Sequence, residues 1–352
     1  MNQHDGRWIG ILSASFSAIL FAMSAPFGKL LLSQMGPLPL AGLLYLGSFA
    51  GITVFVLVRA LTKGRDIGEA PLRRDDFFSL SAAILSGGVF APILLFYGLS
   101  KTPASVASLL LNTEAMLTTL LAALVFHEWV GKRIWVSAAL MLCASLIMVY
   151  SSVETAAPLG PLLIVAACLM WGVDNNITRH LAHKNPLSIA RLKGLVAGPV
   201  TLLLAYSIGD SLPAPPFILR ALLLGAFSYG ASLVLFVYAL RYIGTSRTAT
   251  WFQTAPFLGA VLSLLLLREP LSSRLAVSGF IMICAAALLL REYHTHEHEH
   301  PAIWHEHRHD HDEHHRHEHG IAQAGPHAHP HYHSPLIHSH IHLPDLHHRH
   351  NH

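Results

Sequence analysis

The sequence has few charged residues, and this scarcity excludes an ordinary soluble domain. Only 12% of the 352 residues are Asp, Glu, Lys or Arg, whereas 53% are hydrophobic. Soluble globular domains carry about 25% charged residues. The composition therefore favours an integral membrane protein.

Two further absences narrow the choice of function. The cysteines, Cys143, Cys168 and Cys284, lie in apolar segments and form no CxxC pair, which excludes a zinc finger and a disulfide framework. The formal net charge is only +3, and no basic face interleaved with aromatic residues is present. We therefore expect no nucleic-acid partner.

Ten apolar stretches reach the length of about 20 residues that a helix needs to cross a bilayer. The first is longer than a signal-peptide core and lacks a convincing cleavage site, so we expect it to remain in the protein. The fold class that follows is an all-α integral membrane protein with ten transmembrane helices. The expected spans are 8–31, 38–60, 77–99, 103–126, 134–152, 159–179, 188–208, 218–240, 247–267 and 274–291.

Lys and Arg are distributed unevenly between the loops on the two sides of these spans. With the N-terminus in the cytoplasm, fifteen of them, Lys193 included, fall on the cytoplasmic side and five fall outside. Positively charged loops face the cytoplasm. We therefore expect a multi-pass protein of the cell inner (plasma) membrane with both termini cytoplasmic.

The chain contains an internal repeat, because a shift of 141 residues aligns 97–148 with 238–289 without a gap. A Glu and an Arg that recur at fixed spacing are not expected from apolar composition alone. The identical pairs include Tyr97 with Tyr238, Ser105 with Ser246, Thr113 with Thr254, Glu128 with Glu269 and Arg133 with Arg274.

Each repeat contains five spans, and an odd number turns the second repeat over relative to the first. We therefore expect two inverted five-helix repeats, 1–155 and 156–293, around a central cavity. Inverted repeats are typical of alternating-access carriers, which bind substrate near the membrane midplane. A channel or an enzyme gains less from this architecture, so we predict that the protein is not an enzyme.

Over about residues 8–292 the chain resembles the EamA-type branch of the drug/metabolite transporter superfamily. The family signature is a mid-span Pro followed thirteen residues later by Glu, and Pro256 and Glu269 match it. The first repeat keeps only Glu128, with Ala115 in place of Pro. The resemblance implies ten helices around a cavity and export of a small solute without ATP hydrolysis. We expect both Glu residues of this motif to anchor helix ends.

Glu114 lies near the middle of the fourth expected span, where a carboxylate costs about 2.5–3.5 kcal/mol on insertion scales. Such a group is expected to face the protein interior or a wet cavity. Its repeat counterpart is Ala255, so the acid is not needed to build the repeat. Two interpretations stay open: a structural carboxyl, and a site for substrate binding or proton coupling.

Asp174 and Asn175 stand side by side in the sixth span and offer an acceptor-rich patch. A local pairing of Asp174 with Arg179 or Lys29 is the structural alternative. Our hypothesis is that Glu114 and Asp174 share the cavity and that one of them changes protonation during transport, because neighbouring carboxylates oppose each other's ionisation.

Asn112 and Gln253 occupy paired positions in the fourth and ninth spans. Their amides can hydrogen-bond a solute from opposite halves of the carrier. The alternative is contact between helices, which is worth about 0.6 kcal/mol for each hydrogen bond. Both residues join Glu114, Asp174 and Asn175 as candidates for substrate binding or proton coupling.

Residues 294–352 form a polar tail that contains all but four of the 27 histidines. Polar repeats cannot bury enough surface to fold, so we expect a disordered cytoplasmic tail. Neutral imidazole is a good ligand for Zn, Ni and Co, although a solvated tail without a metal role is the alternative. The candidate ligands are His296, His298, His300, His305, His307, His309, His311, His314, His315, His317 and His319.

Three functions are compatible with these features. The leading interpretation is a secondary-active transporter of the drug/metabolite type that exports a small solute by alternating access, needs no cofactor, and carries a tail able to bind Zn, Ni or Co. The alternatives are an efflux carrier for divalent Zn, Ni or Co, and a membrane-anchored metal buffer or sensor. The expected partners are the lipid bilayer and a small-molecule or metal-ion substrate, and the choice between monomer and homodimer stays open.

Overall fold

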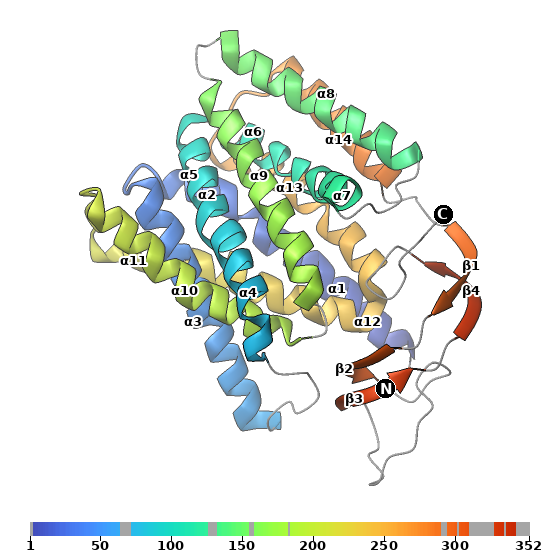
Figure 1. Cartoon of the computed structure of the whole chain (residues 1–352). Coiled ribbons are helices and arrows are strands. Elements are labelled where there is room, and N and C mark those ends of the chain that lie inside the picture. Colours follow the sequence, from blue (N-terminus) through green and yellow to red (C-terminus); the bar gives the residue numbers. More distant parts are fainter. Residues whose placement is uncertain are drawn as a thin grey trace.

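The protein is a bundle of α-helices followed by short strands (Figure 1). The computed structural model describes residues 3–63, 72–125, 132–154, 158–181, 184–289, 294–300, 303–309, 327–333 and 336–342. The helices of the first half are α1 (Gln3–Ala22), α2 (Ser24–Leu31), α3 (Pro37–Lys63), α4 (Phe77–Ala83), α5 (Ala91–Lys101), α6 (Ala104–Leu110), α7 (Thr113–Val125) and α8 (Lys132–Glu154). Those of the second half are α9 (Leu159–Thr178), α10 (Pro186–Ser207), α11 (Pro215–Gly225), α12 (Ser232–Phe252), α13 (Ala255–Leu266) and α14 (Ser273–Leu289).

Eight helical segments of the described residues are long and apolar enough to cross a membrane, and each overlaps one of the first eight expected spans. The ninth and tenth expected spans instead correspond to the shorter apolar helices Ala255–Leu266 and Ser273–Leu288. Pro256, which has no backbone N–H, stands in the first turn of α13 and favours a helix start there. The eight long segments are Trp8–Leu31, Pro37–Thr62, Arg74–Lys101, Ala104–Val125, Lys132–Tyr150, Leu159–Thr178, Pro186–Ser207 and Pro215–Leu240.

Two π-helical segments lie at matching positions of the sequence repeat. The first, η2 (Ile84–Phe90), joins α4 to α5, and the second, η4 (Ala226–Ala231), joins α11 to α12. The shift of 141 residues carries 84–90 onto 225–231. A π-segment loosens the regular hydrogen-bond ladder and is frequent at functional sites. Two single-turn 3₁₀ helices, η1 (Arg74–Asp76) and η3 (Arg179–Leu181), lie at helix ends.

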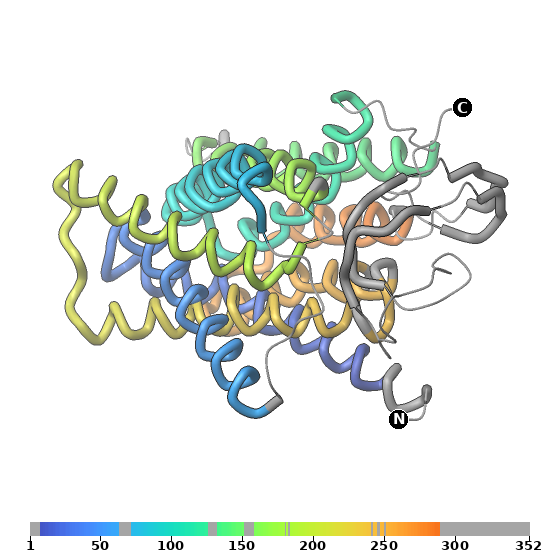
Figure 2. The backbone as a smooth tube through the Cα atoms, turned by 60° about the horizontal axis from the view of Figure 1, so that its bottom comes forward, coloured from blue at the N-terminus to red at the C-terminus, as the bar shows by residue number. Residues whose placement is uncertain are grey.

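The helices pair across the two halves of the chain. α1 packs along α12, and α5 packs along α9. Three more pairs join the halves: α3 with α10, α6 with α13, and α8 with α14. Figure 1 shows α8 and α14 side by side at one edge of the bundle, and Figure 2 shows the blue α1 running beside the yellow to orange α12.

Glycine residues allow the backbones of α3 and α11 to come into direct contact. A Cβ atom on Gly47 would overlap the backbone of Leu222, and one on Gly225 would overlap the backbone of Leu44. Small residues at such crossings are typical of membrane helix pairs, in which close packing supplies much of the attraction.

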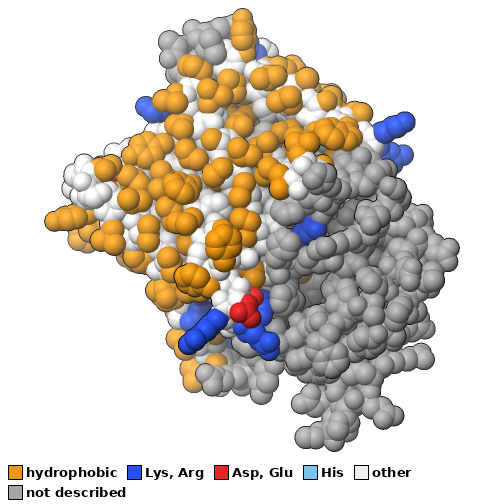
Figure 3. Space-filling model, viewed as in Figure 1, with side chains coloured by type: hydrophobic (Ala, Val, Ile, Leu, Met, Phe, Trp, Pro, Cys, Tyr) orange, Lys and Arg blue, Asp and Glu red, His pale blue; other side chains and the backbone are white. Residues whose placement is uncertain are grey.

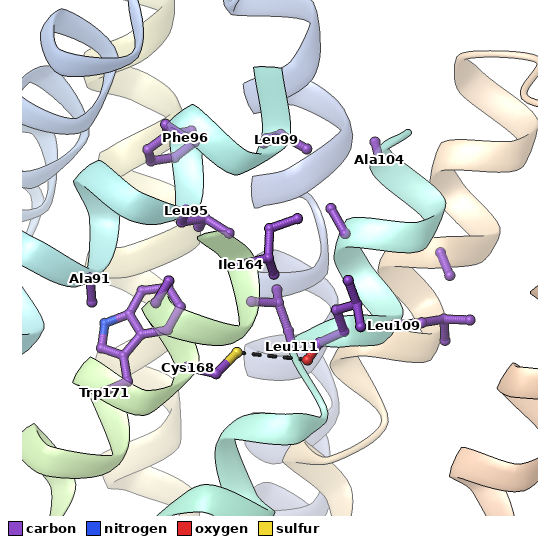
Figure 4. Close-up of a cluster of buried hydrophobic side chains, with 14 of the residues drawn as sticks. Ala91, Leu95, Phe96, Leu99, Ala104, Leu109, Leu111, Ile164, Cys168 and Trp171 are labelled. Atoms are coloured by element: carbon purple, nitrogen blue, oxygen red, sulfur yellow. Dashed lines mark hydrogen bonds between the residues drawn. The ribbon is translucent and has the colours of Figure 1, made fainter. Parts of the chain in front are cut away.

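The largest hydrophobic cluster of the described residues joins both halves of the chain, and Figure 4 shows its part between α5, α6 and α9. Phe96 and Ile164 are almost completely buried in it. Cys168 is fully buried, and its Sγ donates to the Leu110 carbonyl oxygen at 3.6 Å. The thiol therefore acts as a small packing residue with one weak backbone contact.

The outer face of the helices is apolar (Figure 3). Leu12, Phe16 and Ile19 form an exposed stripe along α1 at helical spacing. Large exposed apolar patches of this kind mark a surface that does not face water. The bilayer supplies the apolar surroundings that these side chains require.

The tail differs from the disordered segment predicted from its composition. The described residues of the tail form four strands, β1 (His294–His300), β2 (Ile303–His309), β3 (His327–His333) and β4 (Leu336–His342). β1 pairs with β4 and β2 pairs with β3, both antiparallel. Strict alternation of His with other residues has the two-residue period of a strand, and low hydrophobicity alone does not reveal that period.

Candidate substrate cavity

A cavity of about 330 Å³, here called the polar cavity, lies among α1, α7, α8, α9, α13 and α14. Four of the five residues proposed from sequence line it, and they come from both halves of the chain. These are Asn112, Glu114, Asn175 and Gln253, with Pro256 of the family motif beside them.

Glu114 sits at the start of a helix, not in the middle of a continuous span as the sequence suggested. The fourth span is broken by a turn at Leu111–Asn112, so α7 begins at Thr113 and Glu114 lies in its first turn. The equivalent break in the second half, at Gln253–Thr254, differs by about one residue from the position given by the repeat. Discontinuous helices bring polar groups to the midplane of carriers.

Asn175 connects α9 to this helix start. Its Nδ2 donates to Glu114 Oε1 at 2.9 Å and to Thr118 Oγ1 at 3.3 Å. Among the residues that the structure describes, none hydrogen-bonds Glu114 Oε2 or the Gln253 side-chain amide. Both groups line the cavity and are available to a solute.

Asp174 does not share the cavity with Glu114, which corrects the sequence hypothesis. Both of its oxygens accept from Lys193 Nζ, at 2.8 and 2.6 Å, and Thr178 Oγ1 donates to its Oδ1 at 2.9 Å. The side chains of the pair are 8% and 17% exposed. Successive residues of a helix point about 100° apart, so Asp174 faces α10 whereas Asn175 faces α7.

A second cavity of about 240 Å³, here called the aromatic cavity, lies beside the polar cavity, and Phe21 and Phe252 line both. Their ring centroids are 5.2 Å apart. Lys193 and Tyr229 line the aromatic cavity only. The Phe21–Phe252 pair therefore stands between a region that holds a carboxyl group and a region that holds a buried ion pair.

The π-segment η2 packs against this ion pair at Gly87, whose carbonyl oxygen holds two neighbouring side chains. Tyr45 Oη donates to that oxygen at 2.7 Å, and Trp171 Nε1 donates to it at 3.1 Å. A Cβ atom on Gly87 would overlap the Asp174 carboxylate. Only glycine therefore allows Asp174 to occupy its position against η2 and α10.

Glu269 of the family motif caps a helix of the other half. Its two oxygens accept from the backbone N–H groups of Ala104, at 2.7 Å, and Ser105, at 2.9 Å. These are the first residues of α6, whose unpaired N–H groups favour an anionic cap. The repeat counterpart, Glu128, lies outside the described residues.

Comparison with known proteins assigns a family to this architecture. Residues 8–150 and 158–291 match the sequence profile of the EamA-like transporter family. The chain belongs to this family. The EamA-like chain is a multi-pass membrane transporter of the drug/metabolite type, as the resemblance in its sequence implied, and the family and the relative that it matches are described as transporters.

One relative and one solved structure show how far the similarity of this EamA-like protein extends. A protein of Methanothermobacter thermautotrophicus, described as an uncharacterized transporter, is 30% identical over 300 residues, which cover 80% of this chain and 86% of the relative. A solved crystal structure aligns with a TM-score of 0.56 at 18% identity and covers 82% of this chain and 99% of that chain. The second similarity shows a shared fold.

Lys193 had no predicted role in the EamA-like cavity, because its charge was counted on the cytoplasmic side of the membrane. Asn185 caps α10 by accepting from the backbone N–H groups of Leu187 and Ser188, so α10 begins at Pro186. Lys193 therefore lies about two turns inside the helix. The sequence contained one indication that Lys193 has this role, because a buried acid such as Asp174 requires a cationic or hydrogen-bonding partner.

The candidate metal ligands of the tail divide into two groups. His296, His298 and His300 belong to β1, and His305, His307 and His309 belong to β2. The other proposed ligands lie outside the described residues: His311, His314, His315, His317 and His319. Among the residues whose side chains the structure describes, which do not include those of the tail strands, no group of three His, Cys, Asp or Glu is arranged to hold an ion.

Gly87→Ala is expected to impair both stability and transport. The added methyl group would overlap the Asp174 carboxylate, and overpacking of this kind costs about 1–3 kcal/mol. The displaced carboxylate would also loosen its contact with Lys193. Thermal unfolding of the detergent-solubilised protein measures the first effect.

Gly279→Ala is the matched control for this substitution, because its Cβ would meet Leu109 Cδ1 at an ordinary contact distance of 3.4 Å. We expect its unfolding midpoint to stay close to that of the wild type. Equal midpoints for the two variants would show that Gly87 does not position Asp174.

Proposed function

We propose that this protein is a secondary-active carrier that exports a small organic solute by alternating access. One observation carries the proposal: the polar cavity is built from both halves of the chain, where two helices break, and it presents an unpartnered Glu114 oxygen and the Gln253 amide. Membership of a transporter family supports it. In this proposal residues 1–155 and 156–293 are the two inverted five-helix repeats.

The lining of the two cavities indicates the chemistry of the solute. The polar cavity offers one carboxyl group, amides and the Thr118 hydroxyl. Phe21 and Phe252 provide an apolar wall toward the aromatic cavity. A molecule with hydrogen-bond donors or a cationic group at one end and an apolar body at the other fits this division.

The membrane orientation completes the proposal. The carrier lies in the plasma membrane of the cell in this proposal. The excess of Lys and Arg in the loops on one side favours an orientation with both termini in the cytoplasm. The tail would then lie at the cytoplasmic mouth of the bundle, and outward flux would take its solute from that side.

We test export by expressing the full chain, the Glu114→Gln variant and the chain 1–293 in a host exposed to a panel of metabolites and metals. The full chain and chain 1–293 should both lower the intracellular amount of one organic solute, and Glu114→Gln should not. Protection against Zn, Ni or Co that depends on Glu114 and weakens without the tail would instead indicate metal efflux. Protection that requires only the tail would indicate a metal buffer or sensor.

We also propose that the tail binds transition-metal ions. In the ladder of β1 and β4, His296 is opposite His340 and His298 is opposite His338. Opposite residues of an antiparallel pair share a face, as do residues two apart on one strand. These four positions therefore lie on one face, and four ligands complete a typical zinc site.

Zinc binding by the full chain is expected to depend on the tail and on pH. Calorimetry in detergent at pH 7.5 should detect several ions per full chain and none on the chain 1–293. Ligation needs neutral imidazole, whose ordinary pKa is about 6.5, so affinity should fall sharply at pH 5.5. Equal zinc heats from both chains would show that the tail is not the site.

A further inference from the structure

A groove of about 730 Å³ runs between α1–α2 and α11–η4. We call it the lateral groove. Leu30, Leu223 and Phe227 line it and are largely exposed. All three belong to membrane-length segments. The open side of the groove therefore faces the acyl chains of the bilayer.

One end of the lateral groove is polar and cationic. Gln34 and Arg220 line this end, where α2 has finished and α11 is in its second turn. The guanidinium of Arg220 lies over the Phe217 ring, 5.2 Å from its centroid. Such stacking orients the planar group and leaves its N–H donors free for an anion. No carboxylate of the described residues forms an ion pair with Arg220.

Ser228 lies at the other end, where the lateral groove and the aromatic cavity meet. It lines both spaces. The residue is completely buried, and its Oγ has no hydrogen-bond partner among the described residues. A buried hydroxyl without a partner is uncommon. At this point Ser228 alone therefore separates the lateral groove from the aromatic cavity.

We propose that the lateral groove binds one anionic phospholipid of the bilayer, with its phosphate at Arg220 and an acyl chain along Leu223 and Phe227. Three observations support this occupant. The groove opens to lipid along its length, its cation stands at the end nearest the membrane surface, and that cation has no protein anion to neutralise it. Arg is well suited to bind phosphate through two parallel hydrogen bonds.

The binding site has a consequence for transport. The far end of the acyl chain would lie against Ser228, next to the aromatic cavity. An occupied groove would hold α11 and η4 against α2, so lipid composition would affect movements of these helices. This consequence rests on the proposed carrier function, whereas lipid binding itself does not.

Lipid binding is measured by native mass spectrometry of the full chain, purified in detergent and incubated with phosphatidylglycerol or phosphatidylcholine of identical acyl chains. We expect one phosphatidylglycerol to be retained per chain at collision energies that remove phosphatidylcholine. Arg220→Ala should reduce this retention about tenfold, and Arg220→Lys should reduce it less, because Lys offers a single point charge. Excess inorganic phosphate should not displace the lipid.

Two further variants separate the groove from the rest of the surface. Leu223→Trp fills the groove and should abolish retention of phosphatidylglycerol, whereas Leu219→Trp, an exposed position of α11 that does not line the groove, should retain it. Arg268→Ala, which removes another exposed arginine, should also retain it.

The outcomes that overturn the proposal are distinct. Equal retention by the wild type, Arg220→Ala and Leu223→Trp would exclude the lateral groove as the lipid site. Equal retention of the two lipids by the wild type, or displacement by inorganic phosphate, would exclude an anionic phospholipid as the occupant. An unfolding midpoint measured for each variant ensures that lost binding reflects the site and not the fold. None of these readouts involves transport, so a failure here leaves the carrier proposal untouched.

Discussion

Asp174→Ala is expected to lower the free energy of unfolding by about 3–5 kcal/mol, because it leaves the Lys193 ammonium buried without its partner. The ion pair is close, with the shortest Nζ to oxygen distance at 2.6 Å, and only 17% of the Lys193 side chain is exposed. The loss should appear as a large drop in the unfolding midpoint in detergent. It should be accompanied by loss of transport, since the pair lies beside the aromatic cavity.

A double variant separates charge burial from packing. Asp174→Ala combined with Lys193→Met removes both charges, and buried ion pairs replaced by apolar groups often lose little stability. We therefore expect the double variant to recover most of the unfolding midpoint but not transport. Lys101→Ala, at an exposed lysine, is the control and should change stability by less than about 0.5 kcal/mol. A double variant as unstable as the single one would show that the ion pair is not the cause.

Glu114→Gln is expected to reduce transport by about 10- to 150-fold without a comparable loss of stability. The amide keeps the shape and one acceptor for Asn175 Nδ2, which now lies 2.9 Å from Glu114 Oε1. It removes the negative charge and the protonation equilibrium from the polar cavity. A hydrogen bond to a charged group contributes about 1.5–3 kcal/mol, and each 1.4 kcal/mol corresponds to a factor of ten. Flux in proteoliposomes, measured across an imposed proton gradient, provides the readout.

Thr119→Val is the matched control in the same cavity. Thr119 Oγ1 donates to the Ala115 carbonyl of its own helix at 2.9 Å, and valine preserves the shape of the side chain. We expect less than a threefold change in flux and an unchanged response to pH. Full transport by Glu114→Gln, with the pH response of the wild type, would assign Glu114 a structural role and would direct the search for the coupling group elsewhere.

Much of the site could be predicted because buried polar residues stand out in an apolar sequence. Four candidates for substrate binding stand out in this way, and all of them line the polar cavity: Glu114, Asn175, Asn112 and Gln253. Asp174 is a fifth such candidate, but its carboxylate faces Lys193 instead of the polar cavity. A sequence pattern shows that a polar group needs a partner without identifying that partner.

The breaks in the helices could not be predicted from hydropathy. The segment 104–125 has the length and mean hydropathy of one continuous span, yet it turns at Leu111–Asn112. Hydropathy reports the preference of side chains for lipid, whereas a break is decided by whether neighbouring helices can satisfy the freed backbone groups. The Asn112 side chain contributes to this by donating to the Leu109 carbonyl oxygen at 3.0 Å.

The sequence by itself determined the class of the protein, the repeat and the family, because composition, spacing and the motif of Pro256 and Glu269 are properties of the chain alone. Only the tertiary structure decided which groups meet. Asp174 binds Lys193 of α10, Glu269 caps α6, and Gly87 makes room for the Asp174 carboxylate. Such contacts join residues that are far apart along the chain, and they depend on helix rotation and crossing, which periodicity does not specify.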